Sequence, residues 1–189
     1  MHWIKGCDNM IYCFLADGFE EVEALAPVDI LRRAGAEVKT VGVTGEYVTG
    51  SHGITVKADI EAQAAVLDSS LEAVILPGGM PGTLNLEKSG AVQSAIDFAV
   101  ANDKLVCAIC AAPSILGHKK LLAGREAIAF PGFEKDLYEA RISESHVVKD
   151  GNFITAKGAG VAVDFGLAIA CALFGKEKSD SIRSSIQCI

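Results

Sequence analysis

The chain has 189 residues, of which 50% are hydrophobic and 22% are charged. This length suits one compact domain, and the apolar content excludes an intrinsically disordered chain. A net charge of −7, with no cluster of Lys and Arg and no apolar run long enough to span a bilayer, argues against nucleic acid and membranes as partners.

Short apolar segments alternate with helix-length amphipathic ones, which predicts an α/β fold with a mostly parallel sheet. The predicted strands cover residues 10–16, 37–43, 47–49, 54–57, 73–76, 105–109, 127–130, 147–149 and 153–155. The predicted helices cover residues 20–34, 91–102, 112–122 and 159–174. Gly35 follows two arginines as a C-cap signal for the first helix, and Asp150-Gly151-Asn152 is a strong hairpin signal. The chain shows no internal repeat or linker, so we expect one domain.

The six cysteines would suit three disulfides in number, but their apolar context argues against a disulfide framework. They are Cys7, Cys13, Cys107, Cys110, Cys171 and Cys188. Four of them lie in strongly apolar stretches, and a core of this size needs no covalent cross-links. We therefore expect free thiols in a reducing cytoplasm.

The segment from Val106 to Pro113 joins a buried strand to a helix at Cys110. Small residues, Ala108 and Ala112, stand two positions away on either side, as in a nucleophile elbow, where a sharp turn leaves no room for larger side chains. Amides at the helix start would favour a thiolate and lower the thiol pKa. The alternative is an ordinary buried cysteine that fills space after a strand.

Cys107 and Cys110 also form a C-x-x-C pair, which would suit dithiol redox chemistry or part of a zinc site. However, Cys107 is expected inside the buried strand, away from Cys110. The histidines are scattered without the spacing of a zinc site, so we predict neither a metal nor a cofactor.

Pro77-Gly78-Gly79 ends another apolar strand, and ligands in such sheets gather at the carboxyl ends of the strands. The two glycines allow backbone N–H groups to approach a ligand, so the loop could serve as an oxyanion hole. The alternative is a plain tight turn.

Three glutamates open the first helix: Glu20, Glu21 and Glu23. Carboxylates in a first turn commonly cap the helix, but one held near a thiol in an apolar cleft would have a raised pKa and could move a proton. Glu20 and Glu23 share a face, and composition alone does not choose between them. No histidine is placed convincingly for a Cys–His arrangement.

Five segments together resemble the ThiJ/PfpI superfamily, most closely its parkinsonism-associated protein deglycase branch. They are residues 16–24, 27–35, 76–79, 108–113 and 155–158. The resemblance covers residues 10–189, predicted as a single domain, and leaves residues 1–9 as an N-terminal extension. It implies a flavodoxin-like three-layer sandwich with helices on both faces of the sheet, usually a homodimer.

The resemblance also implies site roles: Cys110 as nucleophile, Glu23 as the acid that handles protons, and backbone amides of Gly78, Gly79 and Ala111 around the sulfur. The implied function is a cofactor-independent enzyme for α-dicarbonyls such as methylglyoxal, or for their early protein adducts. An oxidative-stress sensor or chaperone that uses oxidation of Cys110 is the alternative.

Two departures from the family pattern stand out in the sequence. PfpI-type peptidases carry His directly after the cysteine, and Ala111 takes that place here, which disfavours a cysteine peptidase. The deglycase branch often has a further His before a Pro, and the matching place here is Phe130-Pro131. Any mechanism must therefore run on Cys110 and Glu23, with water.

Overall fold

The computed structural model describes residues 9–188. Of the predicted N-terminal extension, residues 1–8 lie outside the described residues. In the described part of the chain no helix combines the length and the apolar character needed to cross a membrane.

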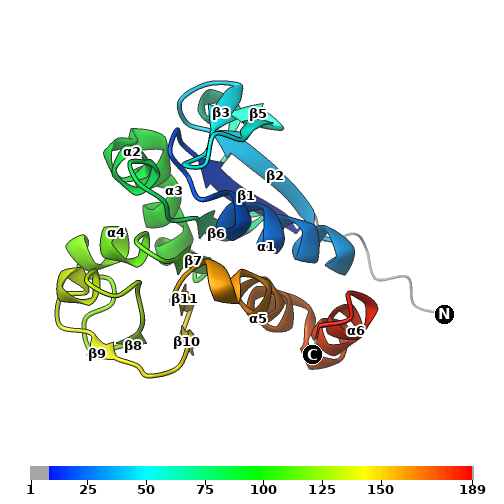
Figure 1. The fold of residues 1–189 in the computed structure, drawn as a ribbon, viewed down its shortest axis with the longest axis vertical. Coiled ribbons are helices and arrows are strands. Elements are labelled where there is room, and N and C mark those ends of the chain that lie inside the picture. Colours follow the sequence, from blue (N-terminus) through cyan, green and yellow to red (C-terminus); the bar gives the residue numbers. More distant parts are fainter. Residues whose placement is uncertain (1–8, 189) are drawn as a thin grey trace.

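A seven-stranded sheet forms the centre of the molecule (Figure 1). Its order is β10 (Val147–Asp150), β11 (Phe153–Ala156), β7 (Leu105–Ile109), β6 (Leu71–Leu76), β1 (Met10–Leu15), β2 (Glu37–Gly42) and β5 (Ile60–Glu61). All neighbours are parallel except the β10–β11 hairpin, whose turn contains the predicted Asp-Gly-Asn signal. Two small sheets stand apart, β3 (Tyr47–Thr49) with β4 (Thr55–Lys57) and β8 (Glu126–Ala127) with β9 (Arg141–Ile142).

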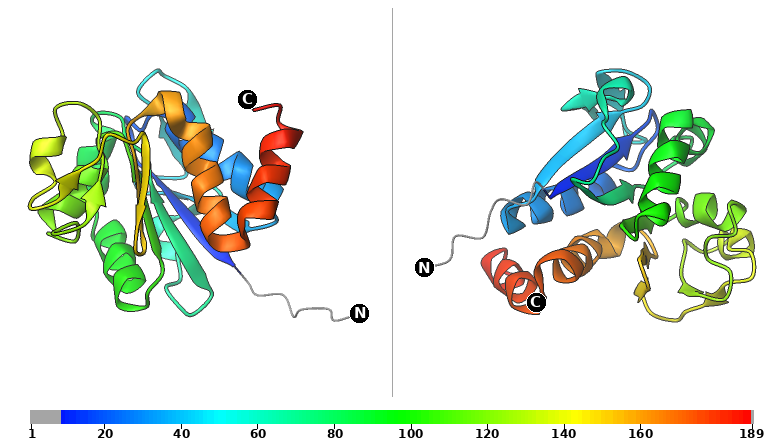
Figure 2. Two further views of the ribbon diagram at one scale, coloured as in Figure 1. Left: turned by 90° about the horizontal axis from the view of Figure 1, so that it is seen from below. Right: turned by 180° about the vertical axis from the view of Figure 1, so that it is seen from behind.

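Helices cover both faces of this sheet (Figure 2). One face packs against α1 (Glu21–Ala34), α5 (Ala162–Phe174) and α6 (Lys176–Ser185). The other packs against α2 (Gly82–Lys88), α3 (Gly90–Ala101) and α4 (Pro113–His118). Three short 3-10 helices complete the fold, at Ala62–Ala64, Glu134–Asp136 and Ala159–Val161.

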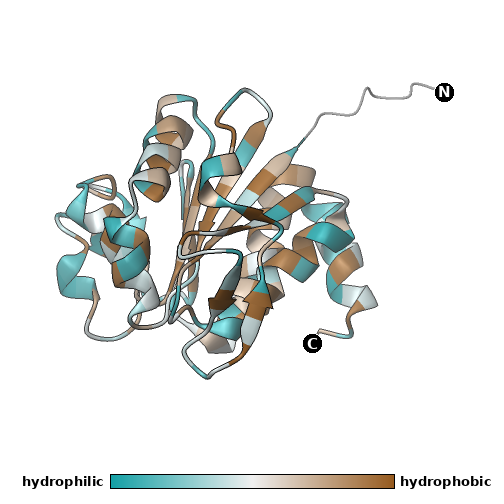
Figure 3. Ribbon diagram, turned by 90° about the horizontal axis from the view of Figure 1, so that it is seen from above, coloured by the Kyte–Doolittle hydropathy of each residue, from teal (hydrophilic) through white to brown (hydrophobic). Residues whose placement is uncertain are grey.

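The central sheet is buried on both faces, so its inner strands consist of apolar residues along most of their length (Figure 3). In β1, Cys13 and Leu15 contribute to the core under α1, while Tyr12 and Phe14 contribute to the core under α3. The prediction of a three-layer α/β sandwich with a mostly parallel sheet is confirmed.

Two element predictions are wrong in extent. The helix predicted over 112–122 ends at His118, because Lys120 adopts a left-handed backbone with φ of 56°. The strand predicted over 127–130 is reduced to β8, because Ile128–Phe130 turns away to contact the central sheet. The Ile128 amide donates to the Thr155 hydroxyl at 3.0 Å, which fixes this segment beside β11.

Candidate active site

The loops after β1, β6 and β7 meet at the carboxyl edge of the sheet, and Cys110 stands at the end of β7. Its φ of 64° is left-handed, a costly conformation for a residue with a side chain. Two backbone hydrogen bonds hold it there: the Cys110 amide donates to Ala156 O at 2.9 Å, and Phe130 N donates to Cys110 O at 2.8 Å. The predicted elbow geometry is therefore present and anchored on both sides.

Glu23 is the carboxyl that reaches this cysteine. The Glu20 side chain caps α1 by accepting from the Glu23 amide at 2.7 Å, which fixes the first turn. Glu23 is 1% exposed, its carboxyl lies beside Cys110 across Gly78, and it accepts from Gly78 N at 3.0 Å. The Ala159 amide also donates to it. The structure thus brings Glu23 and Cys110 together and separates their roles from that of Glu20.

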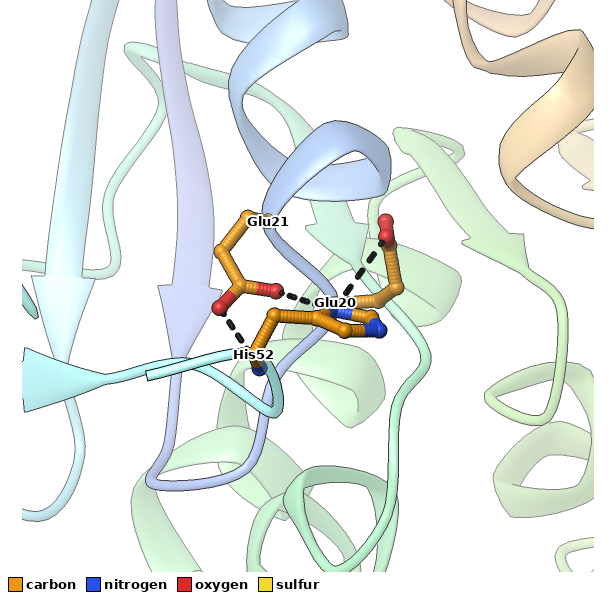
Figure 4. Close-up of side chains that lie close together, drawn as sticks. All are labelled: Glu20, Glu21 and His52. Carbon is orange, nitrogen blue, oxygen red and sulfur yellow. Dashed lines mark hydrogen bonds and ion pairs between the residues drawn. The ribbon is translucent and has the colours of Figure 1, made fainter. Parts of the chain in front are cut away.

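Glu21 turns toward the loop that joins β3 to β4 (Figure 4). Its carboxylate accepts from His52 N at 2.8 Å and contacts His52 Nδ1 at 2.9 Å. Glu20, Glu21 and His52 are the one group of described residues whose ligand atoms could gather around a metal ion. Since Glu20 caps the helix and Glu21 anchors the loop, hydrogen bonding accounts for both carboxylates and we assign no metal to them.

The three predicted backbone donors do not all face the sulfur. The amides of Gly79 and Ala111 donate to Cys110, whereas the Gly78 amide is committed to Glu23. Gly78 must also lack a side chain: a Cβ there would lie 2.6 Å from the Cβ of Cys110 and 2.7 Å from Oε2 of Glu23. Gly78 therefore positions the carboxyl, and two amides are left for the sulfur.

The titrations of the Cys110 thiol and the Glu23 carboxyl are coupled. Burial, reinforced by the charge of Glu20, raises the pKa of Glu23 from 4.5 to about 7. Burial and then the adjacent Glu23 carboxylate raise the pKa of Cys110 to about 12. The predicted lowering of the thiol pKa is wrong, because these effects outweigh the two amides. The hydrogen-bonded pair loses one proton near pH 7, a second near pH 12, and holds a single proton between.

A family model described as the DJ-1/PfpI family matches residues 9–172, which include every residue of this site. The chain belongs to the DJ-1/PfpI family. Among relatives, it is 34% identical to protein dj-1beta of Drosophila melanogaster over 175 residues, covering 91% of this chain and 93% of that protein. The crystal structure of Drosophila melanogaster DJ-1beta matches with a TM-score of 0.90 at 32% identity, over 96% of this chain and 99% of the other.

Two further DJ-1/PfpI relatives bear on function and on length. Deglycase PYRAB04690 of Pyrococcus abyssi is 34% identical over 145 residues, which cover 75% of this chain and 86% of that protein. Protein DJ-1 homolog A of Arabidopsis thaliana is 35% identical over 174 residues, covering 90% of this chain. The chain spans only 44% of the length of this plant relative.

Other sequence candidates lie away from the pair in this DJ-1/PfpI fold. Cys107 is fully buried within β7, and burial raises the pKa of its thiol. The described cysteines are all free thiols. His118 pairs with Glu87, and His52 with Glu21.

The sequence marked Phe130 only as the place of a missing His and Gly158 only as part of the resemblance, and it predicted no role for either or for Ala159 in closing the site. The Ala159 amide holds Glu23, and Gly158 lies next to the Phe130 ring. The matching stretch at 155–158 was part of the family resemblance, but its residue types carry no chemistry of their own. Their contribution comes from backbone position, which only the fold reveals.

Proposed function

We propose that this protein is a cofactor-independent cysteine enzyme that converts α-dicarbonyls such as methylglyoxal, free or released from early protein adducts, into 2-hydroxy acids. The observation that carries the proposal is the placement of the buried Glu23 carboxyl beside the Cys110 thiol at a strained elbow. The deglycase named among the relatives supports the same class of substrate.

In the first step the ionised Glu23 takes the proton of the Cys110 thiol, and the sulfur adds to the aldehyde carbon. A C–S bond forms, the aldehyde oxygen takes up negative charge, and Glu23 delivers its proton to that oxygen to give a hemithioacetal. The amides of Gly79 and Ala111 lie beside the sulfur, where they can stabilise the developing oxyanion.

In the second step the ionised Glu23 removes the proton from the carbon bonded to sulfur and returns it to the neighbouring carbon, while the hydroxyl proton on the first carbon passes to the oxygen of the second. The first carbon is thereby oxidised to a thioester and the second is reduced to an alcohol, so no external oxidant or reductant is needed. Water then cleaves the thioester C–S bond, which releases the 2-hydroxy acid and restores one proton to the pair.

The test is lactate formation from methylglyoxal without glutathione. We expect Cys110→Ala to abolish turnover and Glu23→Gln to lower kcat by about 10²–10⁴-fold, the usual contribution of a positioned acid–base group. Cys171→Ala, which removes an exposed thiol of α5, is the matched control and should keep full activity. Full activity in Cys110→Ala, or none in the wild type, would overturn the proposal.

The same contacts favour one second candidate, a sensor or chaperone that responds to oxidation of Cys110. A sulfinate at Cys110 would accept hydrogen bonds from protonated Glu23 and from the two amides that face the sulfur. Mass spectrometry after mild peroxide would then show two added oxygens on Cys110 and none on Cys171. Equal oxidation of both thiols would count against this function.

We also propose that the protein forms a homodimer through the start of α1. Val22, Leu25 and Ile54 are 51%, 37% and 56% exposed, and the bond from Ile54 N to Glu21 places Ile54 beside this helix. Such an apolar surface suits a second copy. Sedimentation velocity should give a dimer for the wild type and a monomer for Leu25→Glu, and a monomeric wild type would exclude this surface. A cytoplasmic location stays a prediction from the cysteine content.

A further inference from the structure

A cavity of about 460 Å³ opens on the segments that contact Cys110 and Glu23. It is lined by Phe130, Pro131, His146, Lys157, Gly158, Ala159, Gly160 and Val161. Volumes of about 300–1,000 Å³ are typical of pockets that hold drug-sized ligands. Methylglyoxal, whose side group is a single methyl, would leave most of this space unfilled.

Three contacts attach the cavity wall to the reacting groups. Phe130 N donates to the Cys110 carbonyl at 2.8 Å, and the Ala159 amide donates to the Glu23 carboxyl. A Cβ built on Gly158 would lie 3.9 Å from Oε1 of Glu23 and 3.3 Å from Cδ2 of Phe130. Phe130, Gly158 and Ala159 therefore belong both to the cavity wall and to the surroundings of the Cys110–Glu23 pair.

The wall is mainly apolar, and Phe130 is its aromatic residue apart from His146. Phe130 is 47% exposed, although its backbone is fixed to Cys110 and Gly158 leaves room for its ring to pack. Of the residues that line the cavity, none is acidic. A half-exposed, anchored ring beside a catalytic pair offers an aromatic contact to whatever the cavity holds.

We propose that this cavity binds the side group of the substrate and that Phe130 sets a preference for α-oxoaldehydes with an aromatic substituent, such as phenylglyoxal, over methylglyoxal. This inference rests on the proposed function. With the aldehyde carbon bonded to Cys110, the substituent beyond the second carbonyl extends over Gly158 toward the Phe130 ring.

The first experiment compares kcat/KM for phenylglyoxal and for methylglyoxal in the wild type, Phe130→Ala and Tyr138→Ala. Loss of one aromatic contact in Phe130→Ala should lower the ratio of the phenylglyoxal value to the methylglyoxal value about fivefold. Tyr138 is a similarly exposed aromatic, 43%, outside the cavity, so its variant should keep the wild-type ratio. An unchanged ratio in Phe130→Ala would refute the inference.

A second readout does not depend on turnover. The rates at which phenacyl bromide and iodoacetamide alkylate Cys110 compare an aromatic electrophile with a small one. We expect Phe130→Ala to slow only the phenacyl reaction, again by about fivefold. If the wild type turns over neither aldehyde yet keeps this selectivity, the proposed function fails and the subsite stands. If turnover occurs without any selectivity for the aromatic reagent, the subsite fails alone.

Discussion

Replacing Glu23 by Gln should change the pH dependence of stability in a way that follows directly from the burial of this carboxyl. Its pKa is raised from 4.5 to about 7, so the folded state binds this proton more tightly than the unfolded state does. The associated stability is fully present below pH 4.5 and is lost as the pH rises through about 7.

The size of the effect follows from the same pKa values. A tenfold change in proton affinity corresponds to about 1.4 kcal/mol, so the wild type should lose about 3 kcal/mol between pH 4 and pH 8 through this group. No discount for solvent screening applies, because Glu23 is 1% exposed. A Gln can still accept from Gly78 N and can donate to the sulfur of Cys110, but it cannot ionise.

Urea unfolding at pH 4, 6 and 8 measures this change in the free energy of unfolding. One protein concentration is used throughout, so that association does not vary. The stability of Glu23→Gln relative to the wild type should rise by about 3 kcal/mol from pH 4 to pH 8. Glu23→Asp, which disturbs the packing but keeps an ionisable group, should follow the falling curve of the wild type. A difference between Glu23→Gln and the wild type that stays constant with pH would refute the burial argument.

Three further outcomes are expected. Gly78→Ala should lower kcat with methylglyoxal about 100-fold, because its methyl would lie 2.6 Å from Cys110 Cβ and displace the pair, whereas Gly158→Ala should cost only a few-fold; similar kcat values for both would contradict this. Iodoacetamide alkylation of Cys110 should rise with pH to a midpoint at about 7 and then level off, as the pair loses its first proton; a rise that continues to pH 10 would show an isolated thiol. Thr155→Val should destabilise the fold by about 1–3 kcal/mol in urea unfolding, because the Ile128 amide loses its acceptor, and no change would show that another group replaces it.

The parts of the fold that the sequence predicts well are those whose signals are local. The continuous apolar runs of β1, β6 and β7 indicate buried parallel strands, and Gly35 ends α1 with φ of 93° as its position after Arg33 suggests. The two hairpins also follow their turn residues. These patterns depend on the spacing of apolar residues and on the backbone freedom of glycine, and both can be recognised within a single short segment.

The missed elements depend on packing between distant segments. α6 is polar along most of its length and buries only Ser179 and Ile182. α2 begins at Gly82, a poor helix former, and its place is set by Gly82 N donating to Gly18 O at 3.2 Å. The residues that α2 and α6 pack against lie outside the helices themselves. The spacing of apolar residues within a short segment therefore does not reveal these helices.

The candidate site divides in the same way. A small-residue elbow marks Cys110 from sequence, and acidic residues mark the start of α1, but the choice of Glu23 among three glutamates requires the amide of Gly78, 55 residues away. Gly78 itself was predicted as a donor to the reacting centre and instead holds the carboxyl. Which backbone amide faces which atom is decided by the tertiary fold.

In the proposed reaction, the distribution of amides would let one pair serve as both nucleophile and base. Gly79 and Ala111 donate to the sulfur, while Gly78 and Ala159 donate to Glu23, so each member of the pair has two backbone donors for a negative charge. The remaining proton therefore stays on Cys110 above about pH 7, and the amides near the sulfur lower the free-energy cost of passing it to Glu23. Once sulfur is bonded to carbon it no longer holds charge, and Glu23, having given up the proton, is left as the only base at the reacting carbon. An oxidised Cys110 sulfur would also carry negative charge and would leave the proton on Glu23. Loss of Cys110 would abolish both turnover and oxidation, so the variant that separates them is Glu23→Gln.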